Sequence, residues 1–109
     1  MNIDVLSGDA LNEQIAVFMG WKRKDGEWFD PTGDKFDNPP NYTDNSGLFI
    51  GLAYKMRARG YDVTIVLPAQ TGADMIVSLS NAEQTFLGNG ASLALAGCRA
   101  VCKAIQAVI

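Results

Sequence analysis

The alternation of apolar and polar positions along the chain predicts three amphipathic helices separated by short extended segments. In the first helix, Leu11 and Ile15 share one face at the spacing of an amphipathic helix. Ser7 or Asp9 is expected to cap its start, and Gly20 suits the left-handed residue that ends a helix. The three helices are expected over residues 9–19, 44–59 and 91–107.

The stretch "WKRKDGEWF" (21–29) predicts a β-hairpin. Asp25 and Gly26 form a two-residue turn signal, because both central residues of such a turn need positive φ. This turn would place Arg23 opposite Trp28. A guanidinium opposite an aromatic ring is a favourable cross-strand pair.

The remaining segments predict one further hairpin and two loops. "YDVTIVL" (61–67) alternates apolar and less apolar residues, as a strand with one buried face does, and "MIVSLS" (75–80) is expected to be the returning strand. Pro and Gly exclude regular structure over most of "DPTGDKFDNPPN" (30–41). "NAEQTFLGNG" (81–90) is expected to be a loop.

The predicted order of elements is α-β-β-α-β-β-α within a single domain, residues 1–109. Two hairpins supply antiparallel pairs, and together they would form a sheet of about four strands. Three helices are more than one face of so small a sheet needs, so helices are expected on both faces. The predicted fold class is therefore α+β, as a three-layer α-β-α sandwich around a mainly antiparallel, four-stranded sheet.

Composition and charge narrow the class of protein. The 109 residues are 48% hydrophobic and 19% charged, which is typical of a folded domain. A net charge of −3 and a pI of about 4.7 argue against a basic surface for a nucleic-acid polymer. The chain opens without a leader pattern, and no stretch approaches the roughly 20 apolar residues of a membrane span. A cytosolic protein with neither membrane nor nucleic acid as a partner is expected.

The residues that most enzymes use are missing from the sequence. Histidine is absent, which removes imidazole zinc sites and histidine-dependent dyads and triads. Cys98 and Cys102 lie four apart on one predicted helix face and are expected to be free thiols, since helix geometry rarely permits a disulfide there. The acidic loop after the hairpin lacks the spacing of a calcium-binding loop. No catalytic residue, metal or cofactor is therefore predicted, although carboxylate chemistry from Asp30, Asp37 or Asp44 stays open.

The tryptophans and arginines allow two interpretations. In one, the tryptophans close an end of the core. In the other, aromatic and basic side chains bind a flat anionic ligand such as a nucleotide, with stacking on a base, guanidinium contacts to phosphate and neutral hydrogen bonds. The candidate ligand-binding residues are Trp21, Arg23, Trp28, Asn41, Tyr42, Thr43, Arg57 and Arg99.

An ordered set of short motifs resembles the phage ABA sandwich domain family, whose members are small phage and prophage proteins. The likeness covers nearly the whole chain. Asn41 before Tyr42, and Thr43 where the family usually has Ser, depart from its pattern at the entry to the second helix. The matching positions are Met19-Gly20-Trp21, Trp28, Asp30, Gly33, Pro40, Tyr42, Asp44 and Cys98-Arg99-Ala100.

The resemblance implies an α-β-α sandwich and a phage protein acting in the cytoplasm of the bacterial host. Some small phage proteins of similar size are sponges that sequester cyclic nucleotide signals of bacterial defence. By that analogy, the resemblance implies a non-enzymatic binding protein for a small anionic, nucleotide-type ligand. The alternative is a phage structural module or a host-protein interaction module without a small-molecule ligand.

The last helix also bears on assembly. Its small and apolar surface exceeds what one modest sheet can cover. Closely packed small residues suit contacts between helices, so a homo-oligomer is predicted, either a dimer or a tetramer. Helix three or helix two is expected at the interface.

Overall fold

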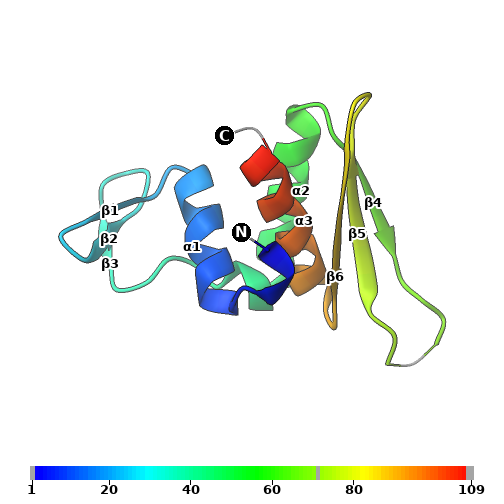
Figure 1. The fold of residues 1–109 in the computed structure, drawn as a ribbon. Coiled ribbons are helices and arrows are strands. Elements are labelled where there is room, and N and C mark those ends of the chain that lie inside the picture. The colour runs from blue at the N-terminus through cyan, green and yellow to red at the C-terminus, as the bar shows by residue number, and fades with distance from the viewer. Residues whose placement is uncertain (1, 71, 108–109) are drawn as a thin grey trace.

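The computed structural model describes residues 2–70 and 72–107, and Figure 1 shows how the helices and sheets are arranged. The helices are α1 (Gly8–Phe18), α2 (Ser46–Ala58) and α3 (Leu93–Ala107), with short 3-10 turns η1 (Ile3–Val5) and η2 (Tyr42–Asp44) before α1 and α2. The smaller sheet holds β1 (Lys22–Lys24), β2 (Glu27–Phe29) and β3 (Lys35–Phe36). The larger sheet holds β4 (Asp62–Val66), β5 (Met75–Ser80) and β6 (Thr85–Gly90).

The three predicted helices are confirmed, and their ends follow local rules. The Ser7 hydroxyl accepts a hydrogen bond from the amide of Ala10 at 3.2 Å and caps α1. Gly20 follows α1 with a φ of 98°. Asn45 caps α2 by accepting from the amide of Leu48 at 3.1 Å.

The predicted first hairpin is also confirmed. Asp25 and Gly26 have φ values of 54° and 80°, as the tight two-residue turn requires. Arg23 lies opposite Trp28 in the register of β1 and β2, and its guanidinium carbon is 5.5 Å from the centre of the Trp28 ring. The local sequence was therefore sufficient to predict this element.

The predicted single sheet of four strands is wrong. The structure has two separate antiparallel sheets, each of three strands, in the orders β1-β2-β3 and β4-β5-β6. The segment 81–90, expected to be a loop, contains β6. Asn81 closes a tight turn by accepting from the amides of Glu83 and Gln84, and the strand begins at Thr85. The glycines of β6 serve close packing against α3.

The prediction of helices on both faces of the sheet is wrong as well. In Figure 1, α2 and α3 lie against one face of the larger sheet, α1 lies beyond them, and the smaller sheet lies outside α1. Val77 and Leu79 of β5 point toward the helices and are buried. The other face needs no helix, because many of its positions are polar. These positions include Thr64, Ser78, Ser80, Thr85 and Asn89.

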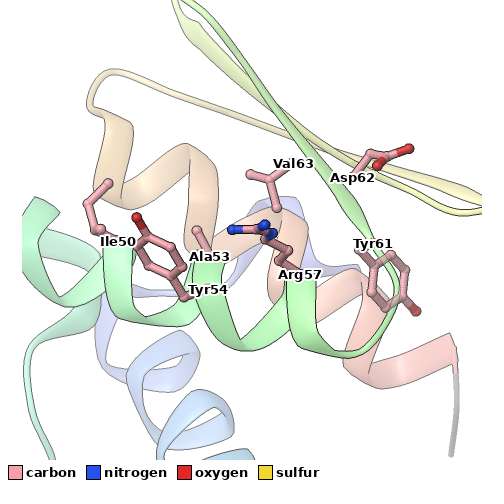
Figure 2. Close-up of a pocket in the computed structure, with 7 residues that line it drawn as sticks. All are labelled: Ile50, Ala53, Tyr54, Arg57, Tyr61, Asp62 and Val63. Carbon is pink, nitrogen blue, oxygen red and sulfur yellow. The ribbon is translucent and has the colours of Figure 1, made fainter.

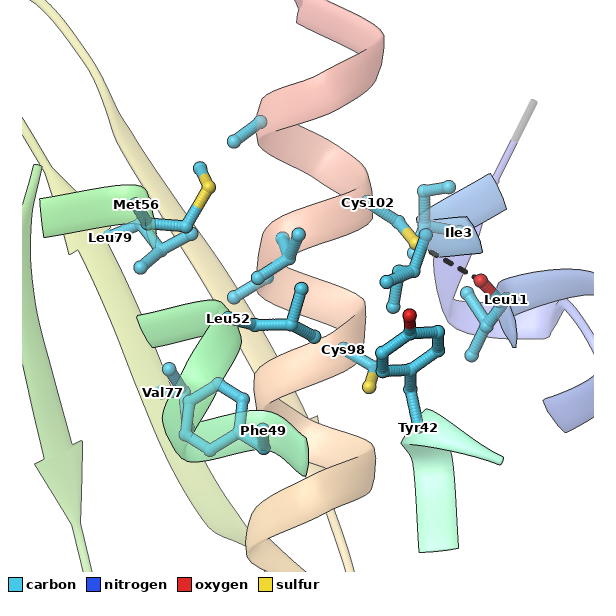
Figure 3. Packing of buried hydrophobic residues seen from close by; sticks show 14 of the residues in the cluster. Ile3, Leu11, Tyr42, Phe49, Leu52, Met56, Val77, Leu79, Cys98 and Cys102 are labelled. Atoms are coloured by element: carbon cyan, nitrogen blue, oxygen red, sulfur yellow. Dashed lines mark hydrogen bonds between the residues drawn. The ribbon is translucent and has the colours of Figure 1, made fainter. Parts of the chain in front are cut away.

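Helix α3 is the centre of the core. It packs against β5 and β6 on one side and against α1, α2 and η2 on the others. Its buried positions include both cysteines, and Figure 3 shows them between the sheet-facing residues and Leu11 of α1. The small residues that suggested a helix–helix interface between chains are therefore largely covered within this chain.

Glycines permit the close approach of α3 to its neighbours. A Cβ atom at Gly88 of β6 would overlap the α3 backbone at Ala96 and Ala100. A Cβ atom at Gly97 of α3 would overlap the ring of Phe49 on α2. Both contacts depend on the absence of a side chain rather than on backbone freedom.

The packing at Gly97 predicts opposite effects for the same substitution in two helices. Gly51→Ala in α2 meets no atom within 4 Å and should raise the free energy of unfolding by about 0.5–1 kcal/mol, because Ala favours a helix over Gly. Gly97→Ala should lower it by roughly 1–3 kcal/mol through overpacking against Phe49. Urea unfolding measures both. A gain of equal size at both positions would contradict the close contact.

Candidate functional site

The candidate ligand-binding residues do not meet in one site of a single chain. Asn41, Thr43 and Arg99 line one polar hollow, and Tyr42 is buried beside it. Arg23 and Trp28 line an apolar hollow against α1, and Trp21 is half-buried and packs against the core. Arg57 lines a third hollow, between α2 and β4. Each group is therefore described on its own.

The polar hollow lies where the start of α1, the η2 turn and the first half of α3 meet. Its volume is about 460 Å³, within the range of small-molecule sites. It brings together segments from three distant parts of the sequence. The lining residues are Leu6, Ser7, Gly8, Asp9, Asn12, Asn41, Thr43, Asp44, Leu95 and Arg99.

A buried amide organises this hollow. Asn12 is 6% exposed and lies on the face of α1 that points inward. Its side-chain nitrogen donates to Asn41 Oδ1 at 2.9 Å, and its oxygen accepts from the amide of Thr43 at 2.9 Å. The Thr43 hydroxyl also donates to Asn41 Oδ1, at 3.2 Å. These bonds fix the chain entering α2 against α1.

Sequence reasoning missed Asn12, although a signal was present. It stands next to Leu11 and one turn before Ile15 and Ala16, all of which are buried. A polar residue on an otherwise apolar helix face must find hydrogen-bond partners when it is buried. That position therefore indicated a long-range polar contact, but not with which segment.

Arg99 supplies the positive charge of the polar hollow. Its Nη1 donates to the carbonyl oxygen of Asn89 in β6 at 2.7 Å. Its Nε is buried and has no hydrogen-bond partner among the described residues. A buried donor left without a partner costs about 1–3 kcal/mol. A ligand oxygen that reached this nitrogen would remove that cost.

Two carboxylates share the polar hollow with Arg99. Asp9 lies in the first turn of α1, and Asp44 ends η2, and both are exposed. One guanidinium and two carboxylates do not suit a polyphosphate. They suit a ligand that combines one negative charge with hydroxyl or amide donors, because carboxylates accept hydrogen bonds from such groups.

Tyr42 belongs to the core rather than to the hollow. It is 5% exposed, and Figure 3 shows its ring among the buried residues near Cys98. The pKa of its hydroxyl is raised, mainly because the side chain is buried. Its side chain holds η2 against α3, and this placement agrees with the core-capping interpretation of the aromatic residues.

The hairpin tryptophan is covered by the arginine beside it. Trp28 is 4% exposed and lines an apolar hollow of about 560 Å³ together with Val17, Phe18 and Ile105. The guanidinium of Arg23 stacks on its ring and lies 3.5 Å from a Glu13 oxygen. A base could stack on the Arg23-facing side of this ring only by displacing Arg23.

Trp21 has an aromatic partner of its own. Its ring centre lies 5.4 Å from that of Phe36 in β3, at an angle of 56°. Trp21 is half-buried and packs against the core. Both tryptophans thus join the smaller sheet to the rest of the molecule.

The acidic loop after the hairpin is closed by its own hydrogen bonds. Asp30 Oδ1 accepts from the Thr32 hydroxyl at 2.6 Å and from the amides of Thr32 and Asp34, each at 2.9 Å. The pKa of Asp30 is lowered, mainly by the hydrogen bond from the Thr32 hydroxyl. Among the described residues, no group of three or more His, Cys, Asp or Glu side chains could hold a metal ion.

The two cysteines are free, as the spacing predicted, and both are buried. Burial raises the pKa of each thiol to about 12, with the neighbouring Cys102 as a smaller contribution at Cys98. The Cys102 thiol points at the carbonyl oxygen of Leu11, 3.8 Å away (Figure 3). A thiol held in its protonated form is a poor nucleophile, so these cysteines serve packing.

Comparison with known proteins shows a likeness in fold to a phage protein. No model of a known protein family and no curated protein matches the sequence. The crystal structure of a phage protein from Bacillus cereus ATCC 14579 is similar, with a TM-score of 0.75 over 94% of this chain and 90% of that one. The fold is that of a known phage protein. At 16% identity the likeness shows the fold alone, and the more specific resemblance to the phage ABA sandwich family stays a prediction.

One further property concerns membranes. Within residues 2–70 and 72–107, no helix is both long and apolar enough to cross a bilayer.

The buried thiols predict a fall in stability at alkaline pH. Their pKa is raised in the folded state from 9.0 to about 12, so deprotonation favours the unfolded chain as pH rises through that interval. The free energy of unfolding should therefore be constant with respect to these groups below pH 9 and should decrease between pH 9 and 12. Urea unfolding at a series of pH values measures this.

The matched control is the double variant Cys98→Ala/Cys102→Ala. It should start from a lower stability, because the replacements leave space in the core, but it should lose less stability on alkalinisation. Subtracting its pH profile removes the contribution of tyrosine and lysine. Parallel profiles for the two proteins would contradict the raised pKa values.

Proposed function

We propose that this chain is a small phage-encoded, non-enzymatic binding protein whose ligand is a small anion of the nucleotide type. In this proposal the ligand is a signal of bacterial anti-phage defence, sequestered in the cytoplasm of the host. The observation that carries the proposal is the polar hollow around Arg99. The likeness in fold to a phage protein supports the phage origin.

The polar hollow offers fixed hydrogen-bonding groups rather than a reactive one. Asn41 and Thr43 are already oriented by Asn12, so little side-chain entropy is lost when they bind a ligand. Arg99 meets the anionic group, and a guanidinium can bind phosphate through two parallel hydrogen bonds. The raised thiol pKa values support a non-enzymatic role, because they remove the cysteines as nucleophiles.

The charges favour one class of ligand within the nucleotides. A cyclic nucleotide carries one negative charge per phosphodiester and presents hydroxyl and base N–H donors. Asp9 and Asp44 can accept hydrogen bonds from such donors, while they repel a chain of phosphates. The ligand class proposed is therefore a cyclic nucleotide rather than a nucleoside triphosphate.

A second candidate function rests on a different surface. Ile50 and Tyr54 of α2 and Ile65, Val66 and Leu67 of the β4 region are large apolar residues that are at least 40% exposed. Exposed apolar residues grouped in this way mark interaction surfaces. The alternative is thus a phage structural module or a host-protein interaction module.

The binding proposal predicts a specific loss in Arg99→Ala. The purified protein is incubated with pooled bacterial nucleotides, washed and denatured, and the released compounds are identified by mass spectrometry. Cyclic AMP, cyclic GMP and cyclic di-AMP are then titrated by calorimetry. Loss of the phosphate-binding arginine should weaken the retained nucleotide about ten- to a hundredfold.

Three further variants test whether the loss of affinity is specific to the polar hollow. Arg23→Ala and Arg57→Ala remove the same charge outside the polar hollow and should leave affinity unchanged. Asn41→Asp keeps the oxygen that accepts from Asn12 and Thr43, adds a negative charge, and should weaken binding without loss of fold. Equal effects of all three arginine variants, or retention of a host protein and no nucleotide, would reject the polar hollow as the site.

A further inference from the structure

The two edges of the larger sheet are treated differently. At the β6 edge, side chains of α3 cover two carbonyl groups. Lys103 Nζ donates to the carbonyl oxygen of Leu87 at 2.7 Å, and Arg99 Nη1 donates to that of Asn89 at 2.7 Å. Leu87 and Asn89 are two positions apart in β6, and the carbonyl groups of alternate residues point to the same side of a strand. The β6 edge is therefore closed to another strand.

Among residues 2–70 and 72–107, no side-chain hydrogen bond of this kind covers the β4 edge. β4 pairs with β5 on one side only, and it is the other terminal strand of the sheet. Thr64, Ile65 and Val66 are exposed. Proteins that stay monomeric protect such edges with lysines, prolines, bulges or a covering segment. Within β4, whose residues are all described, the single charged residue is Asp62 at the first position.

Helix α2 extends this edge with an apolar stripe. Ile50, Tyr54 and Arg57 follow one another at helical spacing and line a hollow of about 440 Å³ beside β4. Figure 2 shows the three side chains on the side of α2 that approaches Val63 of β4. Ile50 and Tyr54 are 42% and 64% exposed. An open strand edge and an apolar stripe therefore form one continuous surface, which we call the α2–β4 surface.

We propose that the α2–β4 surface is the interface of a two-fold homodimer, in which β4 pairs antiparallel with β4 of a second copy. The pairing would join two three-stranded sheets into one of six strands. It would also bring the two α2 stripes together over the same face of that sheet. This proposal is independent of the polar hollow around Arg99, which lies on other elements.

The register of the pair follows from symmetry. Residues opposite each other in an antiparallel pair point to the same face of the sheet, and successive residues alternate between faces. A two-fold axis perpendicular to the sheet must therefore pass midway between one residue and the same residue of the second copy. Pairing at Thr64 brings all of β4 into register, with Val63 opposite Ile65 and Asp62 opposite Val66.

This register explains why a second copy fits better than a charged partner. Thr64 opposite Thr64 is a favourable cross-strand pair, and Val63 opposite Ile65 continues the apolar face toward the helices. No like charges oppose each other in the paired strands. The stripe adds only the charge of Arg57, which Asp62 in the same hollow balances. A nearly neutral, apolar and self-complementary surface selects a copy of itself.

A disulfide cross-link tests both the interface and its register. In Thr64→Cys the two new thiols would face each other across the axis, at a Cα separation of about 4.5–5.5 Å, which a disulfide can span. Diamide should oxidise them to a covalent dimer, as the two thiols form one S–S bond and diamide takes up two protons and two electrons. The native cysteines are buried and should not interfere.

The matched control is Leu87→Cys. Leu87 lies in the same row across the sheet as Thr64, through Ser78, but on the closed β6 edge. It is 50% exposed, so its thiol is accessible and should nevertheless give no covalent dimer. Cross-linking of both variants to the same extent, or of Leu87→Cys alone, would overturn the proposal.

Mass measurement provides the second test. By light scattering at micromolar concentration, the wild-type protein should have the mass of two chains. Thr64→Lys should reduce it to that of one, because two ammonium groups would oppose each other at the axis. Leu87→Lys should leave it unchanged. A monomeric wild-type protein, or dissociation by Leu87→Lys but not by Thr64→Lys, would overturn the proposal.

Discussion

The close approach of α3 to the strand and helix beside it is the constraint on which the rest of the structure depends. It exists because Gly88, Gly90 and Gly97 present no side chain where the backbones and the Phe49 ring come near. The larger sheet, α1, α2 and η2 all pack against this one helix. Dispersion attraction between packed atoms weakens when they separate by fractions of an ångström, so this packing requires small residues on α3. Those residues are thus used for contact within the chain.

The same placement makes the larger sheet asymmetric. Because α3 lies against β6, its basic residues Arg99 and Lys103 reach the outward carbonyls of that strand and close the edge. Lys103 also lies 3.0 Å from Asp4, which links η1 to the same edge. β4, at the opposite edge, lies beyond the reach of α3 and keeps its exposed apolar residues. Edge protection and edge exposure thus have one cause, which is the position of α3.

The polar hollow around Arg99 is likewise a product of packing between distant segments. The start of α1, the turn before α2 and the side of α3 each contribute a few polar groups, and Asn12 ties two of these segments together. Arg99 contributes to the β6 edge and to the polar hollow. One of its nitrogens donates to the carbonyl of Asn89, and its side chain also lines the hollow. Away from this hollow, Trp28 lies against Arg23 and Trp21 lies against Phe36, both of which are side chains of the smaller sheet.

The sequence by itself determined the elements whose cause is local. The three helices, the Asp25-Gly26 turn with its Arg23–Trp28 pair, and the β4–β5 pairing follow from periodicity and from residues that tolerate positive φ. It also predicted free thiols, and it named three residues that share the polar hollow. Only the tertiary structure decided that Gly88 and Gly90 belong to a strand, because a glycine required by a close neighbour has the same local pattern as a glycine in a loop. Contacts between segments far apart in the chain also placed Arg23, Arg57 and Arg99 in different hollows. The same kind of contact placed all helices on one side of the larger sheet. No local pattern in the sequence encodes such contacts.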